Sequence, residues 1–283
     1  MIAMSTLLTL LLSLTPATAV PLTPVTGPIS GLTAAGMSQE EGEAPKPDER
    51  PEVAKLLDQL EEHYNDRKGE QDEAAVGLVD SLLQEFPESG PKDRESIVDG
   101  IADAVTVKRL LDDEDQPRDT LQIAAATALG RMGPESGPAL IKLVDHKALR
   151  ETLRAHGAVL KSLGRVHPEK GVKPLIEMLD HKDEELVAAA SVGLAGYVEA
   201  DQKVRKDIVE NLLKTIIPLK DALANGEDAS SAYEEARERF DAISAAVRDT
   251  LQVLTGHDER EFYAWRDWWN DNKKKDWDAG RAD

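Results

Sequence analysis

Apolar residues recur every three or four positions through most of the chain after residue 52. The first three stretches with this pattern hold Val53, Leu56, Leu57 and Leu60, then Ala75, Leu78, Val79, Leu82, Leu83 and Phe86, then Ile97, Ile101, Ala104 and Val105. Such spacing places the apolar side chains of each stretch on one face of a helix. No stretch alternates clearly between apolar and polar residues, and the proline-containing segments 87–91 and 115–117 indicate turns. The pattern predicts an all-α fold.

An internal repeat indicates how these helices are organised. Leu-Gly-Arg at 129–131 recurs at 163–165, 34 positions later, and Asp-His-Lys at 145–147 recurs at 180–182, 35 positions later. In each copy an Ala-rich helix ends at Leu-Gly, a turn contains proline, and a second amphipathic helix follows. Because one helix pair of about 35 residues cannot bury its own apolar face, neighbouring pairs must stack.

Two further copies extend the repeat with looser agreement. In one, the first helix ends at 194–196 and the long second helix contains Pro218, which we expect to kink it. In the other, the first helix ends at 254–256. The repeat predicts an α-α superhelix, an α-solenoid of four to five helix pairs over residues 52–275 that ends in an aromatic capping helix. Its clearest repeats are 118–147, 148–182 and 183–225.

The residues between the two Asp-His-Lys markers carry a resemblance to a known family. The stretch 143–182, LVDHKALRETLRAHGAVLKSLGRVHPEKGVKPLIEMLDHK, resembles HEAT repeats, and the likeness extends over 118–199. Leu-Thr-Gly at 254–256 followed by an aromatic helix is similar to the end of many exported bacterial HEAT-repeat proteins. The resemblance implies an armadillo-type α-solenoid that binds other macromolecules. It implies no reaction, because this scaffold serves many unrelated partners.

The net charge of the chain is −20, and it is distributed unevenly. Residues 38–117 carry −15, 118–182 carry +4, 183–272 carry −10 and 273–283 carry +1. An acidic chain repels phosphate groups, so we expect neither nucleic acid nor an anionic membrane as partner. Only the middle segment favours an anionic partner.

Four cations of that middle segment are the candidate partner-binding residues, and two of them, Arg131 and Arg165, occupy equivalent places in successive repeats. The four are Arg131, Lys142, Arg165 and Lys173. The second helix of each pair usually lines the concave wall of a solenoid, where the two lysines would lie, whereas the two arginines follow Leu-Gly near the turn within each pair. The alternative is that these cations only neutralise the acidic segments on either side.

The N-terminal region predicts export. Residues 7–14 form an apolar run too short to span a bilayer, and Ala17-Thr18-Ala19 supplies a cleavage pattern of small residues. We therefore expect a signal peptide at 1–19, followed by a disordered Pro/Gly-rich linker at 20–51 and, at the other end, a flexible tail at 276–283. The alternative for 1–19 is a disordered apolar tail. The chain has no cysteine, which excludes disulfides, a lipidated cysteine and thiolate metal sites.

An aromatic cluster lies near the C-terminal end. On a helix from about residue 259 to 273, four aromatic side chains fall within about 120° of arc. They are Phe262, Trp265, Trp268 and Trp269. We interpret them as a structural cap over the last repeat, with the rings of Phe262, Trp265 and Trp269 buried against residues 245–254. The alternative is a platform for sugars or peptides, and we expect Trp277 to be exposed.

No motif in the chain indicates catalysis, a cofactor or a metal. His146 and His181 lie beside aspartates, but stacked helices about 8–10 Å apart place them too far from one another to share a zinc ion. Polar residues of these repeat turns are expected instead to cap helix starts. The acidic segment 111–119 lacks the glycine and glutamate of a calcium loop, and no pair of carboxylates stands out as acid and base.

These observations predict a non-catalytic protein-binding scaffold of the cell envelope or secreted space. One alternative is a carbohydrate- or cell-wall-binding module that uses the C-terminal aromatic residues. Another is a cofactor-handling HEAT-like lyase, since some HEAT-like proteins are bilin lyases. Exposure of the aromatic rings distinguishes the first alternative, and a deep pocket would be needed for the second.

Overall fold

Eleven α-helices make up most of the chain that the computed structural model describes, residues 46–112, 114–226 and 230–279. Among these residues no strand occurs beyond a single bridge between Leu111 and Pro117, so the all-α prediction is confirmed. The predicted signal peptide and most of the predicted linker lie outside the described residues. None of the helices described is both long enough and apolar enough to cross a bilayer.

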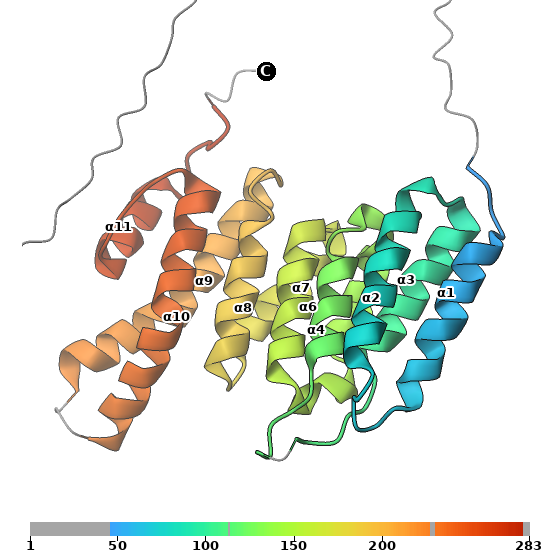
Figure 1. Ribbon diagram of the computed structural model, residues 1–283. Coiled ribbons are helices and arrows are strands. Elements are labelled where there is room, and N and C mark those ends of the chain that lie inside the picture. The colour runs from blue at the N-terminus through green and yellow to red at the C-terminus, as the bar shows by residue number, and fades with distance from the viewer. Residues whose placement is uncertain (1–45, 113, 227–229, 280–283) are drawn as a thin grey trace, which may run out of the picture. The chain divides into compact units, whose positions relative to one another are not determined.

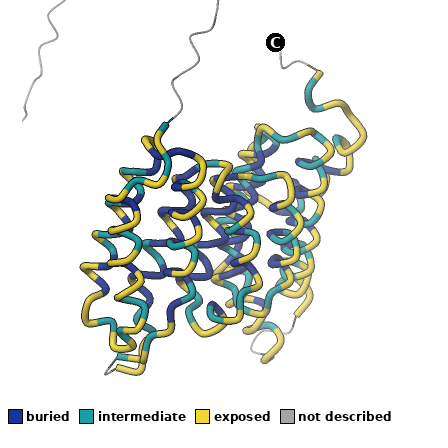
Figure 2. Tube along the Cα trace, turned by 90° about the vertical axis from the view of Figure 1, so that its right-hand side faces the viewer, coloured by how far each residue is buried: buried dark blue, intermediate teal, exposed yellow. Residues whose placement is uncertain are grey.

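The helices form two layers, and neighbours within a layer lie side by side (Figure 1). The first layer contains α2 (Asp72–Glu85), α4 (Thr120–Leu129), α6 (Leu153–Val166), α8 (Glu184–Ala195) and α10 (Ser231–Thr255). The second contains α1 (Pro51–Glu62), α3 (Pro91–Val105), α5 (Gly137–Val144), α7 (Val172–Glu177), α9 (Gln202–Asn225) and α11 (Phe262–Asn272). Figure 2 shows buried positions where helices face one another and exposed positions on the outer sides. The predicted α-solenoid is confirmed, with five described helix pairs from α2/α3 to α10/α11 preceded by α1.

Direct backbone contact explains why Leu-Gly recurs at the ends of first-layer helices. A Cβ atom on Gly164 of α6 would lie 2.1 Å from the carbonyl oxygen of Gly193 in α8. A Cβ on Gly196, just after α8, would lie 1.8 Å from the carbonyl oxygen of Gly164, and one on Gly130 would lie 2.7 Å from Oγ of Ser162. At these ends no side chain fits between α6 and α8, and only the small Ser162 side chain lies between α4 and α6.

The N-terminal end of the array is closed by α1 and by the residues just before it. Asp48 Oδ1 accepts hydrogen bonds from the backbone N–H groups of Lys92 (2.9 Å) and Asp93 (3.2 Å) at the start of α3. The Asp93 carboxylate in turn accepts from the N–H groups of Glu49 (3.0 Å) and Arg50 (3.1 Å). Residues 46–50 therefore belong to the folded array, and the linker boundary predicted at residue 51 is too late.

At the other end, α11 packs on α9, the second-layer helix before it, and buries most of its large aromatic rings. The side chains of Phe262, Trp265 and Trp269 are buried, and the Trp265 indole N–H donates to the carbonyl oxygen of Glu259 at 2.9 Å. The backbone of α11 packs mainly on α9 rather than on the stretch 245–254 of α10 that the sequence analysis favoured. The reason is that α11 belongs to the second layer and stacks on α9, the helix before it in that layer.

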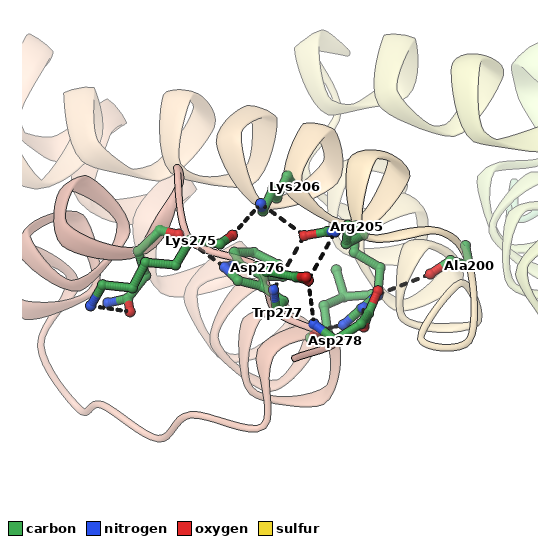
Figure 3. A network of polar contacts seen from close by, with 10 residues as sticks. Ala200, Arg205, Lys206, Lys275, Asp276, Trp277 and Asp278 are labelled. Carbon is green, nitrogen blue, oxygen red and sulfur yellow. Dashed lines mark hydrogen bonds and ion pairs between the residues drawn. The ribbon is translucent and has the colours of Figure 1, made fainter. Parts of the chain in front are cut away.

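The residues that follow α11 also differ from their prediction. Residues 275–278 lie against α9 through several hydrogen bonds, and the Trp277 ring is half-buried instead of exposed (Figure 3). The flexible tail predicted from residue 276 therefore does not describe residues 276–278.

Gly164→Ala should lower the free energy of unfolding by about 2–3 kcal/mol, because the added methyl group must displace the backbone of α8. Chemical denaturation measures the change. Gly77→Ala is the matched control, since Gly77 lies exposed within α2 and a Cβ there meets nothing within 4 Å. Alanine should stabilise the chain at position 77 by about 0.8–1 kcal/mol through its higher helix propensity. Equal effects of the two substitutions would contradict the close-contact explanation.

Trp265→Ala should cost about 3–5 kcal/mol of stability, because the indole is completely buried. Opening should concentrate in the last helix pair, since pairs at the end of a repeat array are held from one side only. A thermal melt beside Val253→Ala, a large-to-small change at an exposed position of α10, provides the comparison. A melting-temperature shift below about 1 °C for Trp265→Ala would reject the cap and support an aromatic binding platform.

Candidate protein-binding site

Three cations form a straight stripe along α6. Arg154, Lys161 and Arg165 are separated by seven and four positions, which at 100° per residue places them within about 40° of one another around the helix. All three side chains are exposed. The helix buries its opposite side, which includes Leu160 and Leu163, in the core. We call these three residues the basic stripe.

The basic stripe lines a groove of about 460 Å³ between α4, α6 and α8. The helices can approach here because the residues at the groove are small, among them Gly157, Ala158, Ser162 and Ala189. Glu185 is the one carboxylate among the residues that line it. The groove therefore combines a floor of small side chains with three cations, an arrangement that attracts an anionic segment.

The three cations differ in how firmly they are held. Arg154 forms an ion pair with the buried carboxylate of Asp119 at 3.3 Å, which fixes the N-terminal end of the stripe. Neither Lys161 nor Arg165 forms an ion pair with any described residue. Their charges are therefore available to a partner, and either residue can be substituted without leaving a buried carboxylate unpaired.

The structure does not bring the four predicted partner-binding residues together. Arg165 lies in the basic stripe, and Arg131 is exposed in the turn just after α4. Lys173 is exposed on α7, where its amine lies 3.7 Å from the Glu177 carboxylate. Lys142 lies on α5 and faces a different groove in the second layer. The sequence analysis did not select Arg154 and Lys161, although their seven-residue spacing could have identified them.

The groove that contains Lys142 is acidic. It has a volume of about 730 Å³ and lies between α3 and α5. The charged residues around it are Arg94, Lys142, Glu95, Asp99, Asp103 and Glu135. Partial burial, and then the charge of Asp99, raise the pKa of the Asp103 carboxyl above its ordinary value. Carboxylates outnumber cations in this groove, so it does not favour the acidic partner expected from the sequence.

The repeat-turn histidines accept backbone hydrogen bonds, and His146 caps the 3-10 helix Lys147–Glu151. His146 Nδ1 accepts a hydrogen bond from the backbone N–H of Ala148 at 3.4 Å, and His181 Nδ1 accepts from that of Asp183 at 3.1 Å. Asp183 then caps α8 by accepting from the N–H of Glu185 at 3.0 Å. Capping was predicted for the polar residues of these turns, but the residues that do it are His146 and Asp183. Among the described residues, no three metal-ligating side chains lie close enough to hold an ion.

The acidic turn before α4 is organised by a single carboxylate. Asp112 Oδ1 accepts hydrogen bonds from the backbone N–H groups of Glu114 (2.9 Å) and Gln116 (2.8 Å). These bonds lower the pKa of Asp112 below its ordinary value. The carboxylate therefore holds the turn closed through the protein backbone.

A comparison of the sequence with protein families supports the repeat interpretation. Residues 121–146 match the family described as PBS lyase HEAT-like repeat. The match spans almost all of α4, the turn after it and all of α5, which together are one helix pair. This helix pair is therefore similar to a HEAT-like repeat. The word lyase belongs to the family description and assigns no reaction to this chain.

No curated protein matches this chain. Similar solved structures include a designed armadillo repeat protein in complex with the peptide (KR)4. It is 15% identical in sequence, the alignment covers 69% of this chain and 99% of that chain, and the TM-score is 0.28. An engineered protein has 19% identity, 70% and 98% coverage and a TM-score of 0.30. A second designed armadillo repeat protein has 15% identity, 74% and 95% coverage and a TM-score of 0.29. TM-scores this low do not show a shared overall path, so the fold assignment depends on the helix pairs themselves.

Within the helical array, α6 also contains a buried histidine, His156. Burial lowers the pKa of His156 below its ordinary value of 6.5, because the charged imidazolium loses water. The charge of His181 acts in the same direction, while the carboxylates of Asp145 and Asp183 oppose it. His156 therefore favours its neutral form in the folded chain.

The folded chain should become less stable as the pH falls below 6.5, the ordinary pKa of histidine. The unfolded chain binds a proton at His156 more readily than the folded chain, so the free energy of unfolding should fall as the pH drops from 6.5 toward the lower folded-state pKa. Above pH 6.5 this contribution is fully retained. Urea denaturation at about pH 7.5 and 5.5 should show a smaller loss for His156→Leu than for the unmodified chain.

His167→Asn is the control for this measurement. His167 is exposed and left-handed, with φ of 41°, a conformation that asparagine tolerates. The control should lose as much stability as the unmodified chain. An equally large loss in His156→Leu would show that other groups cause the pH dependence.

Proposed function

We propose that this chain is a non-catalytic protein-binding scaffold whose α6 groove binds an acidic segment of a partner protein. The observation that carries the proposal is the alignment of Arg154, Lys161 and Arg165 beside a groove of small residues. A stripe of cations on a repeat surface meets carboxylates at regular spacing, which gives specificity and speeds association. The chain is otherwise strongly acidic, with a net charge of −20, so an acidic partner is directed to this surface.

The setting that we propose for this activity is the cell envelope or the secreted space. The apolar run at 7–14 and the small residues at 17–19 support it. In that setting the partner is a protein with an acidic surface segment. No cofactor or metal takes part in the proposed binding.

Burial of the aromatic rings weakens the carbohydrate-binding alternative. Trp265 and Trp269 are buried, and the half-buried Trp268 stacks on the imidazole of His257 with a centroid distance of 4.9 Å. Sugar binding by aromatic residues needs a ring face open to water. These rings instead pack on protein groups.

Substituting the unpaired cations of the stripe should weaken binding of an acidic probe. A fluorescently labelled deca-glutamate peptide, measured by anisotropy, should bind the Lys161→Glu/Arg165→Glu variant at least about tenfold more weakly than the unmodified chain at low salt. Raising the NaCl concentration should weaken binding to the unmodified chain, because ions screen exposed charges.

The matched control is Lys147→Glu/Lys182→Glu, which changes the net charge equally at exposed lysines of the repeat turns. This variant should keep most of the affinity. If both double variants bind the probe equally, the effect is one of net charge and the α6 groove is not the site. Capture of a partner from the native envelope by the unmodified chain, and its loss in the stripe variant, would extend the result to the natural ligand.

A further inference from the structure

The start of α9 binds the backbone of a short segment that follows α11 (Figure 3). The Lys206 amine donates to the carbonyl oxygen of Lys275 at 2.6 Å. The Gln202 side-chain amide makes two contacts: Nε2 donates to Asp276 Oδ1 at 3.0 Å, and Oε1 accepts from the backbone N–H of Trp277 at 3.2 Å. Two backbone groups and one carboxylate of the segment are thus bound by side chains from about one turn of α9.

A buried guanidinium binds the acidic residue of the same segment. Arg205 is 2% exposed, and its side chain donates to the carbonyl oxygens of Ala200 at 3.0 Å and Leu254 at 3.3 Å. Its remaining amino group forms an ion pair with Asp278, whose side chain is 41% exposed. The cation is therefore fixed by the folded array, whereas the carboxylate reaches it from the surface. A buried charge that loses its partner is costly, so this position favours a carboxylate.

The Trp277 ring lies between two kinds of side chain. On α9, Arg205 and Lys206 lie over the ring at 5.8 and 5.3 Å from its centroid. On α11, the rings of Trp268 and Trp269 lie 5.6 and 6.0 Å from it, centroid to centroid. Cations over an indole face and edge-on indoles are both favourable contacts, so this space suits a tryptophan.

The buried aromatic rings of the cap do not all depend on this segment. Phe262 packs edge-on against Phe240 of α10 at 5.6 Å, with Arg248 over its ring. Trp265 packs against His257 at 5.3 Å and donates its hydrogen bond to the loop before α11. Phe262 and Trp265 thus pack on groups other than residues 275–278.

We propose that the start of α9, together with Trp268 and Trp269 of α11, is a peptide-binding site for a segment in which aspartate follows tryptophan, and that residues 275–278 occupy it as an intramolecular ligand. Arg205 binds the carboxylate, the cations and indoles bind the tryptophan, and Gln202 binds the backbone. A site filled in this way is closed to other Trp-Asp segments until residues 275–278 leave it.

The experiment uses the full chain and a labelled peptide with the sequence of residues 275–283. The Trp277→Ala/Asp278→Ala variant should bind this peptide at least about tenfold more tightly than the unmodified chain, because its site is no longer filled. Fluorescence anisotropy measures both. Peptides carrying Trp277→Ala or Asp278→Ala should lose at least about tenfold in affinity for the variant. The Lys275→Ala peptide is the matched control and should bind normally, since Lys275 contacts α9 through its backbone oxygen.

Asp278→Ala alone is the second variant if the double variant fails to fold, and it should also bind the peptide more tightly than the unmodified chain does. The proposal is overturned if neither variant binds the peptide more tightly, or if the altered peptides bind as well as the original. Light scattering should show that the unmodified chain is monomeric. A dimer that Asp278→Ala dissociates would overturn the intramolecular assignment and place the segment of a second copy in the site.

Discussion

Contact between the backbones of first-layer helices is the constraint on which the rest of this structure depends. Gly164 meets Gly193 and Gly196 at distances that exclude any Cβ atom. Such contact fixes where α6 and α8 cross, and hence how far the rest of each helix lies from its neighbour. The groove beside the basic stripe follows from this geometry, since the helices diverge only as far as Gly157 and Ala189 require. The proposed binding surface thus originates in residues that have no side chain.

Local sequence patterns were sufficient to predict the helices and their repeat. Apolar spacing predicts an amphipathic helix without reference to the rest of the chain, and two markers 34 and 35 residues apart identify the stacked unit. The layer to which each helix belongs was harder to predict, because it depends on which helices stack on one another. The sequence analysis therefore placed α11 against α10, its neighbour along the chain, whereas α11 packs on α9.

The candidate site was only partly predictable for a related reason. The stripe on α6 lies within one helix, so its spacing was present in the sequence, although only Arg165 was selected. The groove around Lys142 contains carboxylates such as Asp99 and Asp103, which lie about 40 residues earlier in the sequence. They are near Lys142 only because α3 stacks on α5. Trp277 was expected to be exposed because no residue near it in the sequence indicates a partner for its ring. The partner, Arg205 on α9, lies 72 positions earlier in the chain.

The central position of α6 keeps it away from the ends of the array, where opening of helix pairs starts. The main contacts of each helix pair are with the pairs on either side, so disorder that starts at one end need not reach the middle. Two pairs lie beyond α6/α7 toward the C-terminal side, and α1 with two pairs lies on the other. The basic stripe is therefore the part of the surface best protected from fraying. This arrangement keeps the proposed binding surface ordered when a helix pair at either end of the array opens.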